Sequence, residues 1–136
     1  MSRARILFAD DHKEMRDRVT RVLEKEFELL DAVTDGQALL EAASELEPDL
    51  CLLDISMPVV NGFEAAARLR KSGSKAKIVF LSIHEDVDFV HAAYEAGASA
   101  YVIKRRIGRD LLTAIRAALA GRTFTSAIAV PGGESE

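Results

Sequence analysis

The fold of this chain is decided by the sequence LCLLDISMPVVNG, residues 50–62. It begins with a short apolar run, places the carboxylate of Asp54 at the end of that run, and then breaks into Pro58 and Gly62. An apolar run bounded by turn residues is typical of a buried strand. In an open α/β sheet, ligands collect beyond the carboxyl ends of the strands. Asp54 is therefore a candidate functional residue, although Asp is also common in turns.

Three other strand-like apolar runs also end in polar residues, namely Asp10 and Asp11, Ser82, and Lys104. If the strands are parallel and adjacent, their ends bring three carboxylates, a hydroxyl and an ammonium to one cleft. Three carboxylates close together are tolerated only with a cation among them. Mg²⁺ takes oxygen ligands and commonly binds carboxylates together with phosphate oxygens. The pattern predicts a phosphoryl and divalent-cation site.

Two hydrophobic periods alternate along the chain and predict a doubly wound parallel sheet. Thr34 and Gln37 form a capping-box signal for the second helix, and Asn61 is expected to cap the third. Glu85 and Asp86 are expected in the first turn of the fourth helix, where acidic groups are favourable. Strands are expected at 5–9, 28–33, 49–54, 77–82 and 101–104, the second at a sheet edge, and helices at 12–25, about 35–47, 62–71, about 85–96 and about 109–120.

Length and composition narrow the class of protein. The 136 residues suit one domain, and 18 basic against 22 acidic residues give a net charge of −4, which provides no general attraction for nucleic acid. The single Cys51 has no internal disulfide partner, is expected to be a small buried hydrophobe, and suits a reducing cytoplasm. No apolar stretch approaches the roughly 18–20 residues that span a membrane. We therefore expect a cytoplasmic protein without a membrane segment.

The order and spacing of these residues resemble the receiver domain of two-component response regulators, in particular the NarL/FixJ (LuxR-type) subfamily. The resemblance implies a flavodoxin-like (βα)5 fold, with a five-stranded parallel sheet in the order 2-1-3-4-5. We expect 1–122 to form the receiver and 123–136 to be a C-terminal extension or flexible tail, or the start of a linker to an output domain. The motifs are Asp10-Asp11, Asp54 with Met57-Pro58 and Asn61-Gly62, Ser82, the segment 96–104 with Tyr101 and Lys104, and the helical segment 114–121.

The resemblance also implies roles for individual residues. Asp54 is expected to accept a phosphoryl group from a sensor histidine kinase, with Lys104 pairing first with Asp54 and later with a phosphoryl oxygen. Ser82 is expected to move toward the phosphoryl group and let Tyr101 turn inward, which changes the surface of the fourth helix, the last strand and the last helix. The alternative for Tyr101 is a partly buried strand residue with its hydroxyl in water.

The same resemblance implies a Mg²⁺ or Mn²⁺ site. Asp11 is expected to bind the cation directly and Asp10 mainly through water, with Asp54 and the backbone carbonyl of Ser56 as further ligands. Ser56 and His84 occupy the positions that flank the water attacking the phosphoryl group in the family. They are expected to tune dephosphorylation, unless His84 simply faces solvent.

Partners follow from the resemblance: a sensor histidine kinase, a second copy of the chain on phosphorylation, and DNA only through a domain that these residues do not contain. Lys104 is followed by Arg105 where many receivers have Pro, so a cis peptide is not carried over to this chain. Arg105 and Arg106 are either a solvated basic turn or a contact for an acidic partner.

Three other functions remain open from the sequence. A phosphohydrolase with an aspartyl-phosphate intermediate usually needs a carboxylate at position 56, which is Ser. A flavin-binding electron carrier shares the fold class, but the charge of the first loop, Asp10-Asp11-His12, would repel the phosphate unless a cation intervened. A degenerate receiver that only binds partners would not need every charged site residue. The chain is not expected to be an enzyme, beyond catalysing its own phosphorylation and dephosphorylation.

Overall fold

The computed structural model describes residues 3–127. Its strands are β1 (Arg5–Ala9), β2 (Glu28–Val33), β3 (Leu50–Asp54), β4 (Lys77–Ser82), β5 (Ala100–Ile103) and β6 (Phe124–Thr125). Its helices are α1 (Lys13–Leu23), α2 (Gly36–Leu46), α3 (Gly62–Lys71), α4 (Val87–Glu95) and α5 (Ile107–Leu119), with a 3-10 turn η1 (Lys104–Arg106) before α5.

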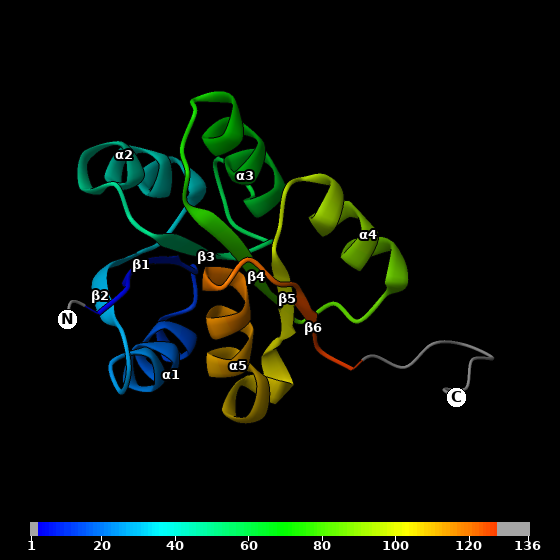
Figure 1. Ribbon diagram of the computed structural model, residues 1–136. Coiled ribbons are helices and arrows are strands. Elements are labelled where there is room, and N and C mark those ends of the chain that lie inside the picture. Colours follow the sequence, from blue (N-terminus) through cyan, green and yellow to red (C-terminus); the bar gives the residue numbers. More distant parts are fainter. Residues whose placement is uncertain (1–2, 128–136) are drawn as a thin grey trace.

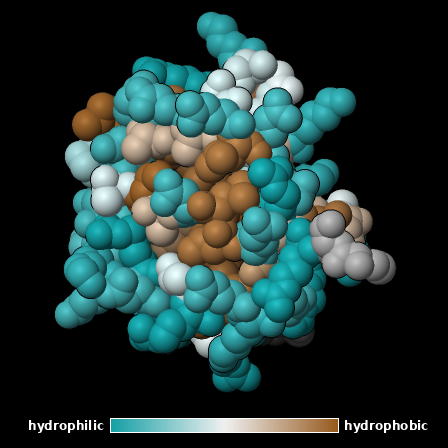
Figure 2. Space-filling model, turned by 90° about the vertical axis from the view of Figure 1, so that its left-hand side faces the viewer, coloured by the Kyte–Doolittle hydropathy of each residue, from teal (hydrophilic) through white to brown (hydrophobic). Residues whose placement is uncertain are grey.

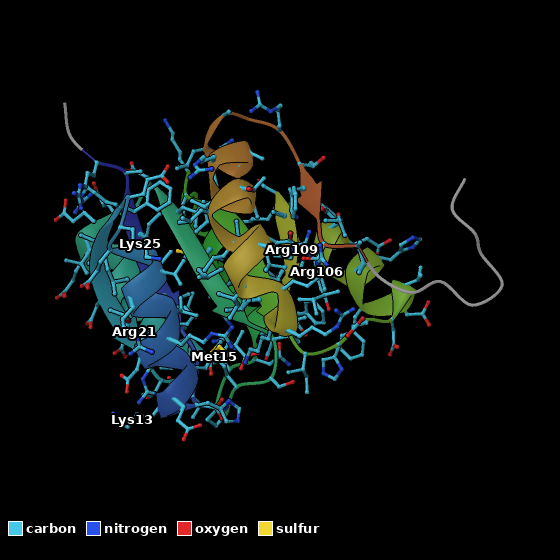
Figure 3. The ribbon with its side chains drawn as sticks, turned by 90° about the horizontal axis from the view of Figure 1, so that it is seen from below. Lys13, Met15, Arg21, Lys25, Arg106 and Arg109 are labelled. Carbon is cyan, nitrogen blue, oxygen red and sulfur yellow. The ribbon has the colours of Figure 1, made fainter. Side chains whose placement is uncertain are left out.

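The strands form one parallel sheet in the order β2-β1-β3-β4-β5-β6. The first five strands confirm the predicted flavodoxin-like order, and β6 adds a short strand beside β5. Figure 1 shows α2, α3 and α4 on one face of the sheet and α1 and α5 on the other. In Figure 3, which views the molecule from below, α1 and α5 cover the sheet, with Met15 on α1 and Arg106 before α5.

Buried side chains alternate between two cores, as the two-residue period of a strand requires. On β3, Cys51 and Leu53 face the core under α2, α3 and α4, whereas Leu50 and Leu52 face the core under α1 and α5. Burial raises the pKa of the Cys51 thiol to about 12. Cys51 is therefore the small buried hydrophobe that its place in the strand predicts.

The predicted edge position of β2 is confirmed. The side of the molecule on which β2 lies carries a group of hydrophobic residues surrounded by polar ones (Figure 2), and Leu29, Leu30, Ala32 and Val33 of β2 are only half-buried. Asp31 lies exposed within the same strand. A charge on an edge strand opposes pairing with the strands of other molecules.

The start of α2 differs from the predicted capping box. The N-cap is Asp35, whose Oδ1 accepts a hydrogen bond from Ala38 N at 2.8 Å, not Thr34. Gln37 donates to Glu41 at 3.1 Å instead of reaching back to the helix start. The charged Asp oxygen is a stronger acceptor than a hydroxyl at the positive end of a helix, so the helix begins one residue later than the box requires.

The elements around Lys104 also differ in their bounds. Lys104 is the first residue of η1 and not the last of β5, and α5 begins two residues before the expected Arg109. At α4, Asp86 is the N-cap and Glu85 precedes the helix, where its carboxylate pairs with Arg105. No peptide bond within residues 3–127 is cis.

Residues beyond α5 return to the sheet. Phe124 and Thr125 pair with Ala100 and Tyr101 of β5, and the Tyr94 hydroxyl of α4 donates to the carbonyl of Phe124 at 3.0 Å. The start of the predicted extension 123–136 is thus docked on the domain, while 128–136 lie outside the described residues. The boundary at residue 122 stays a prediction. Within 3–127, no helix has the length and apolar character of a bilayer-spanning segment.

Candidate functional site

The carboxyl ends of four neighbouring strands meet at one edge of the sheet. Asp54 ends β3 and Ser82 ends β4, while Asp10 and Lys104 directly follow β1 and β5. Because these strands are parallel neighbours, residues distant in sequence converge at this edge. The structure therefore brings together the residues at the strand ends that the sequence singles out.

Lys104 lies among buried carboxylates. Its Nζ is 2.8 Å from Asp10 Oδ2 and 3.4 Å from Asp54 Oδ1. The exposed fractions of Asp10, Asp54 and Lys104 are 0%, 3% and 6%, so these ion pairs are shielded from water. The short contact to Asp10 is an ion pair without hydrogen-bond geometry, and Oδ2 of Asp10 and Oδ2 of Asp54 have no hydrogen-bond partner. Buried oxygens of this kind normally have one.

The cluster carries an excess of negative charge, since the carboxylates of Asp10, Asp11 and Asp54 lie together, whereas Lys104 pairs with Asp10 and Asp54 and Arg16 donates to the Asp10 carbonyl at 2.9 Å. Burial raises the pKa of Asp54 from 3.8 to about 6; the Lys104 charge opposes this shift and the Asp10 charge adds to it. A carboxylate with a raised pKa is destabilised in its charged form. A divalent cation at this position would relieve that destabilisation.

The donor atoms present fit such a cation. Asp10, Asp11, His12 and Asp54 each offer one ligand atom, and these atoms all lie within 4.8 Å of one another. The side chain of Asp11 is 32% exposed, whereas Asp54 is buried and its Oδ2 has no hydrogen-bond partner. Several carboxylate oxygens with access to water are the environment in which Mg²⁺ is commonly bound.

The loop behind Asp54 is packed too closely for side chains at two glycines. A Cβ atom on Gly62 would lie 2.4 Å from the carbonyl oxygen of Asp54, and one on Gly36 would lie 2.1 Å from that of Val60. Asn61 caps α3 as predicted, its side chain accepting a backbone hydrogen bond. The Asn61-Gly62 pair thus holds the start of α3 directly against the end of β3.

Comparison with known proteins identifies the family. Residues 6–116 match the response regulator receiver domain. The chain belongs to this family.

Two relatives show the subfamily. The chain is 34% identical over 125 residues to the transcriptional regulatory protein DegU of Brevibacillus brevis, which covers 90% of this chain and 53% of that protein. It is 33% identical over 130 residues to the nitrate/nitrite response regulator protein NarL of Escherichia coli strain K12, covering 94% of this chain and 60% of that protein. The predicted membership of the NarL/LuxR type is confirmed. The chain spans little more than half the length of these curated relatives.

Solved structures agree in fold. A LuxR-family response regulator from Aurantimonas sp. SI85-9A1 superposes with a TM-score of 0.87 at 33% identity, covering 92% of this chain and 91% of that one. The receiver domain of the putative response regulator NarL from Mycobacterium tuberculosis has a TM-score of 0.85 at 27% identity, covering 90% and 100%.

The two switch candidates of this receiver are joined through the backbone of His84. The Ser82 hydroxyl accepts a hydrogen bond from His84 N at 3.0 Å, and the Tyr101 hydroxyl donates to His84 O at 2.7 Å. Tyr101 is fully buried, and burial raises the pKa of its phenol. The tyrosine therefore already points inward, which corrects the alternative in which its hydroxyl lies in water.

The two residues expected to flank the attacking water differ in their surroundings. Ser56 is exposed. The imidazole of His84 stacks on the ring of Phe89, with centroids 3.9 Å apart and an interplanar angle of 3°. His84 is half-buried. The structure therefore does not agree with the alternative in which His84 simply faces solvent.

The basic pair after Lys104 is not simply a solvated turn. Arg105 forms a two-point ion pair with Glu85, at 2.6 and 2.8 Å, and the adjacent guanidinium lowers the pKa of Glu85. Arg106 Nε donates to Asp110 at 2.8 Å. These contacts join the loop after β4 and the start of α5 to the segment that carries Lys104.

Sequence reasoning missed a buried polar network beside β5. Ser126 Oγ donates to Asp110 Oδ2 at 2.7 Å and accepts from Ile103 N at 3.1 Å. The Arg106–Asp110 spacing of four residues was a usable signal for the helical pair. The position of Ser126 had no local signal. Sequence reasoning also missed the contacts of His12 with Asp10 and Asp11, for which its position directly after the acidic pair is the signal.

Proposed function

We propose that this chain is a phosphoryl-accepting signalling switch of a two-component system. Asp54 receives a phosphoryl group from a sensor histidine kinase in a reaction that depends on Mg²⁺ or Mn²⁺, and the altered surface of α4, β5 and α5 controls an output. The observation that carries the proposal is the buried Asp54 carboxylate, with one oxygen unpartnered and the other 3.4 Å from Lys104 Nζ.

In this reaction, a carboxylate oxygen of Asp54 attacks phosphorus in line with the bond that breaks. The new P–O bond replaces the P–N bond of a phosphohistidine, whose nitrogen takes a proton from solvent, or the P–O bond of acetyl phosphate. A bound divalent cation supplies neutralisation of the phosphoryl charge. Asp10, Asp11, Asp54 and the Ser56 carbonyl are the groups that would hold it.

Lys104 and Ser82 complete the site. The Lys104 ammonium is buried and close to Asp54, so it can stay beside a phosphoryl oxygen and stabilise the charge that develops during transfer. The Ser82 hydroxyl accepts a hydrogen bond from His84 and keeps its own hydrogen available to donate to a phosphoryl oxygen.

The switch passes from Ser82 to the output surface through His84. When Ser82 moves toward the phosphoryl group, the hydrogen bond from His84 N to Ser82 and the one from the Tyr101 hydroxyl to His84 O change. α4 follows because the His84 ring is stacked on Phe89 of α4. The output is transcription control through a DNA-binding domain, with a homodimer formed on phosphorylation and the protein acting in the cytoplasm. A stand-alone receiver acting by protein contact is the second candidate.

The test is incubation with acetyl phosphate and Mg²⁺, followed by intact mass. We expect a gain of one phosphoryl group, about 80 mass units, that Asp54→Asn abolishes. A persistent adduct at full occupancy on the variant would overturn the assignment of Asp54. A phosphohydrolase would instead turn over acetyl phosphate many times per molecule, while a flavin carrier and a degenerate receiver would gain no mass.

The cation role of the acidic pair is tested separately. Asp11→Ala should weaken Mg²⁺ binding and slow phosphorylation, since it removes a ligand oxygen. The matched control is Asp17→Ala, which removes a carboxylate that pairs with Lys13 on the exposed face of α1. Equal Mg²⁺ affinity of Asp11→Ala and the wild-type protein in a calorimetric titration would contradict the role of Asp11.

A further inference from the structure

His12 holds one ring nitrogen at the mouth of the cation site. Its backbone N–H donates to Asp10 Oδ1 at 2.8 Å, which fixes the start of α1 against that carboxylate. Its Nδ1 lies 3.2 Å from the same oxygen and 3.0 Å from Asp11 Oδ1. Because carboxylate oxygens only accept, Nδ1 carries the hydrogen in these contacts, and binding a metal through Nδ1 requires the tautomer with the hydrogen on Nε2. The ring itself is 67% exposed, so its nitrogen enters the site without burial of the whole side chain.

This nitrogen belongs to the same set of potential ligand atoms as the carboxylates. Asp10, Asp11, His12 and Asp54 offer atoms within 4.8 Å of one another. Ligand atoms about 2.1 Å from one metal lie at most about 4.2 Å apart, so side-chain shifts of roughly half an ångström bring all of them into range. Within this cluster, Oδ2 of Asp54 and Oδ2 of Asp10 are buried without a hydrogen-bond partner, and a bound cation would satisfy such oxygens.

We propose that His12 Nδ1 is a ligand of the cation site and shifts its preference from Mg²⁺ toward Mn²⁺ and the later divalent transition metals. The inference rests on the proposed function, because it assumes that a cation binds among Asp10, Asp11 and Asp54. A site of oxygen atoms alone suits Mg²⁺, a hard ion that keeps its waters. An imidazole nitrogen adds a donor that transition metals bind well and Mg²⁺ does not.

The surrounding charges favour a divalent ion of either kind. Three carboxylates lie together here, whereas Lys104 pairs with Asp10 and Asp54 and the Arg16 guanidinium donates to the Asp10 carbonyl, so negative charge remains in excess and attracts a cation of suitable size. Charge therefore sets the total affinity, while the His12 nitrogen sets which metal is preferred. If His12 served only to orient the carboxylates, its loss would weaken Mg²⁺ and Mn²⁺ binding alike.

The experiment is a Mn²⁺ titration of the intact chain by electron paramagnetic resonance, with pulsed detection of nitrogen coupling and a parallel Mg²⁺ competition. The variants are His12→Ala and, as a matched control, His91→Ala, which removes an exposed histidine from α4. We expect a directly bound imidazole nitrogen in the wild-type protein and in His91→Ala, and its loss in His12→Ala. The preference for Mn²⁺ over Mg²⁺ should fall about tenfold in His12→Ala.

The outcomes separate this inference from the proposed function. Two results overturn the inference while phosphorylation of Asp54 by acetyl phosphate still stands. One is Mn²⁺ binding without a nitrogen coupling that depends on His12. The other is an unchanged ratio of Mn²⁺ affinity to Mg²⁺ affinity in His12→Ala. Failure of both cations to bind overturns the inference and the proposed cation dependence together. Loss of the nitrogen coupling together with a lowered ratio supports it, provided that the circular dichroism spectrum of His12→Ala matches that of the wild-type protein.

Discussion

Replacing Asp54 by Asn should stabilise the protein in the absence of divalent cations. Burial raises the pKa of Asp54 from 3.8 in its ordinary state to about 6 in the fold. The charged form is thus less favourable in the folded than in the unfolded protein. The difference of about two pKa units corresponds to roughly 3 kcal/mol at neutral pH, at about 1.4 kcal/mol per unit.

The sign of the pH dependence follows from the raised pKa. Below the pKa of the unfolded state, Asp54 is neutral in both states and does not change the free energy of unfolding. As the pH rises through the folded value of about 6, the unfolded protein is favoured increasingly. Asn keeps the shape of Asp without the charge, so Asp54→Asn should gain about 2–3 kcal/mol near neutral pH and almost nothing near pH 4.

The assay is urea unfolding of both proteins with a chelator present, at about pH 4 and about pH 7.5, which bracket the titration. Asp110→Asn is the control, because its expected effect on the free energy of unfolding has the opposite sign. Burial raises the pKa of Asp110, but hydrogen bonds from Arg106 and Ser126 outweigh burial and leave the pKa below its ordinary value. The Asp110 carboxylate therefore contributes stability above the unfolded pKa, which is lost as the pH falls through the folded value.

A loss of stability in Asp54→Asn near neutral pH, or an equal gain at both pH values, would refute this account of the site. Added Mg²⁺ offers a second check, because a ligand that binds only the folded state stabilises it by about 2.7 kcal/mol at one hundred times its dissociation constant. The wild-type protein should show this stabilisation and Asp54→Asn should show much less. Equal stabilisation of the two proteins would place the cation elsewhere.

Further predictions concern packing, the docked C-terminal segment and the lifetime of the phosphoryl group. Ser126→Ala should lower the free energy of unfolding, measured in urea, by about 1–3 kcal/mol, because it leaves the buried N–H of Ile103 without a partner. A change within experimental error would mean that the segment is not docked. Gly36→Ala should lower the melting temperature, because the added Cβ clashes directly with the backbone, at a cost of about 1–3 kcal/mol. In Gly108→Ala of α5 the added Cβ meets no atom within 4 Å, so this variant should be neutral or stabilising. Equal shifts of the melting temperature in the two variants would contradict the packing. His84→Ala should change the dephosphorylation rate while leaving phosphorylation by acetyl phosphate largely intact, and matching decay curves would remove His84 from the timing.

The fold of this receiver could be predicted because its signals are local and repeated. Each apolar run is long enough for one strand, and each helical stripe follows within the same stretch of chain, so alternation alone requires a parallel sheet. The strand order, which the resemblance to receiver domains implies, then determines that Asp10, Asp54, Ser82 and Lys104 meet, since the carboxyl ends of neighbouring parallel strands share one edge. No side-chain geometry was needed for that step.

Other features were decided only by the tertiary structure. The choice of Asp35 over Thr34 as N-cap depends on where the chain leaves β2, and the inward position of Tyr101 depends on the carbonyl of His84 being placed to accept its hydroxyl. Both involve competition between local options of similar energy, and contacts formed elsewhere in the fold decide between them.

What the sequence by itself determined is the set of charged and polar residues at the strand ends and the sheet that gathers them. Only the tertiary structure decided that Ser126 would fold back onto Asp110, and that a nitrogen of His12 would lie between two carboxylates. The physical reason is that periodicity specifies which face a residue occupies, whereas hydrogen bonds and metal ligation depend on distances of a few tenths of an ångström. Those distances are set by the packing of the whole domain, which no local pattern encodes.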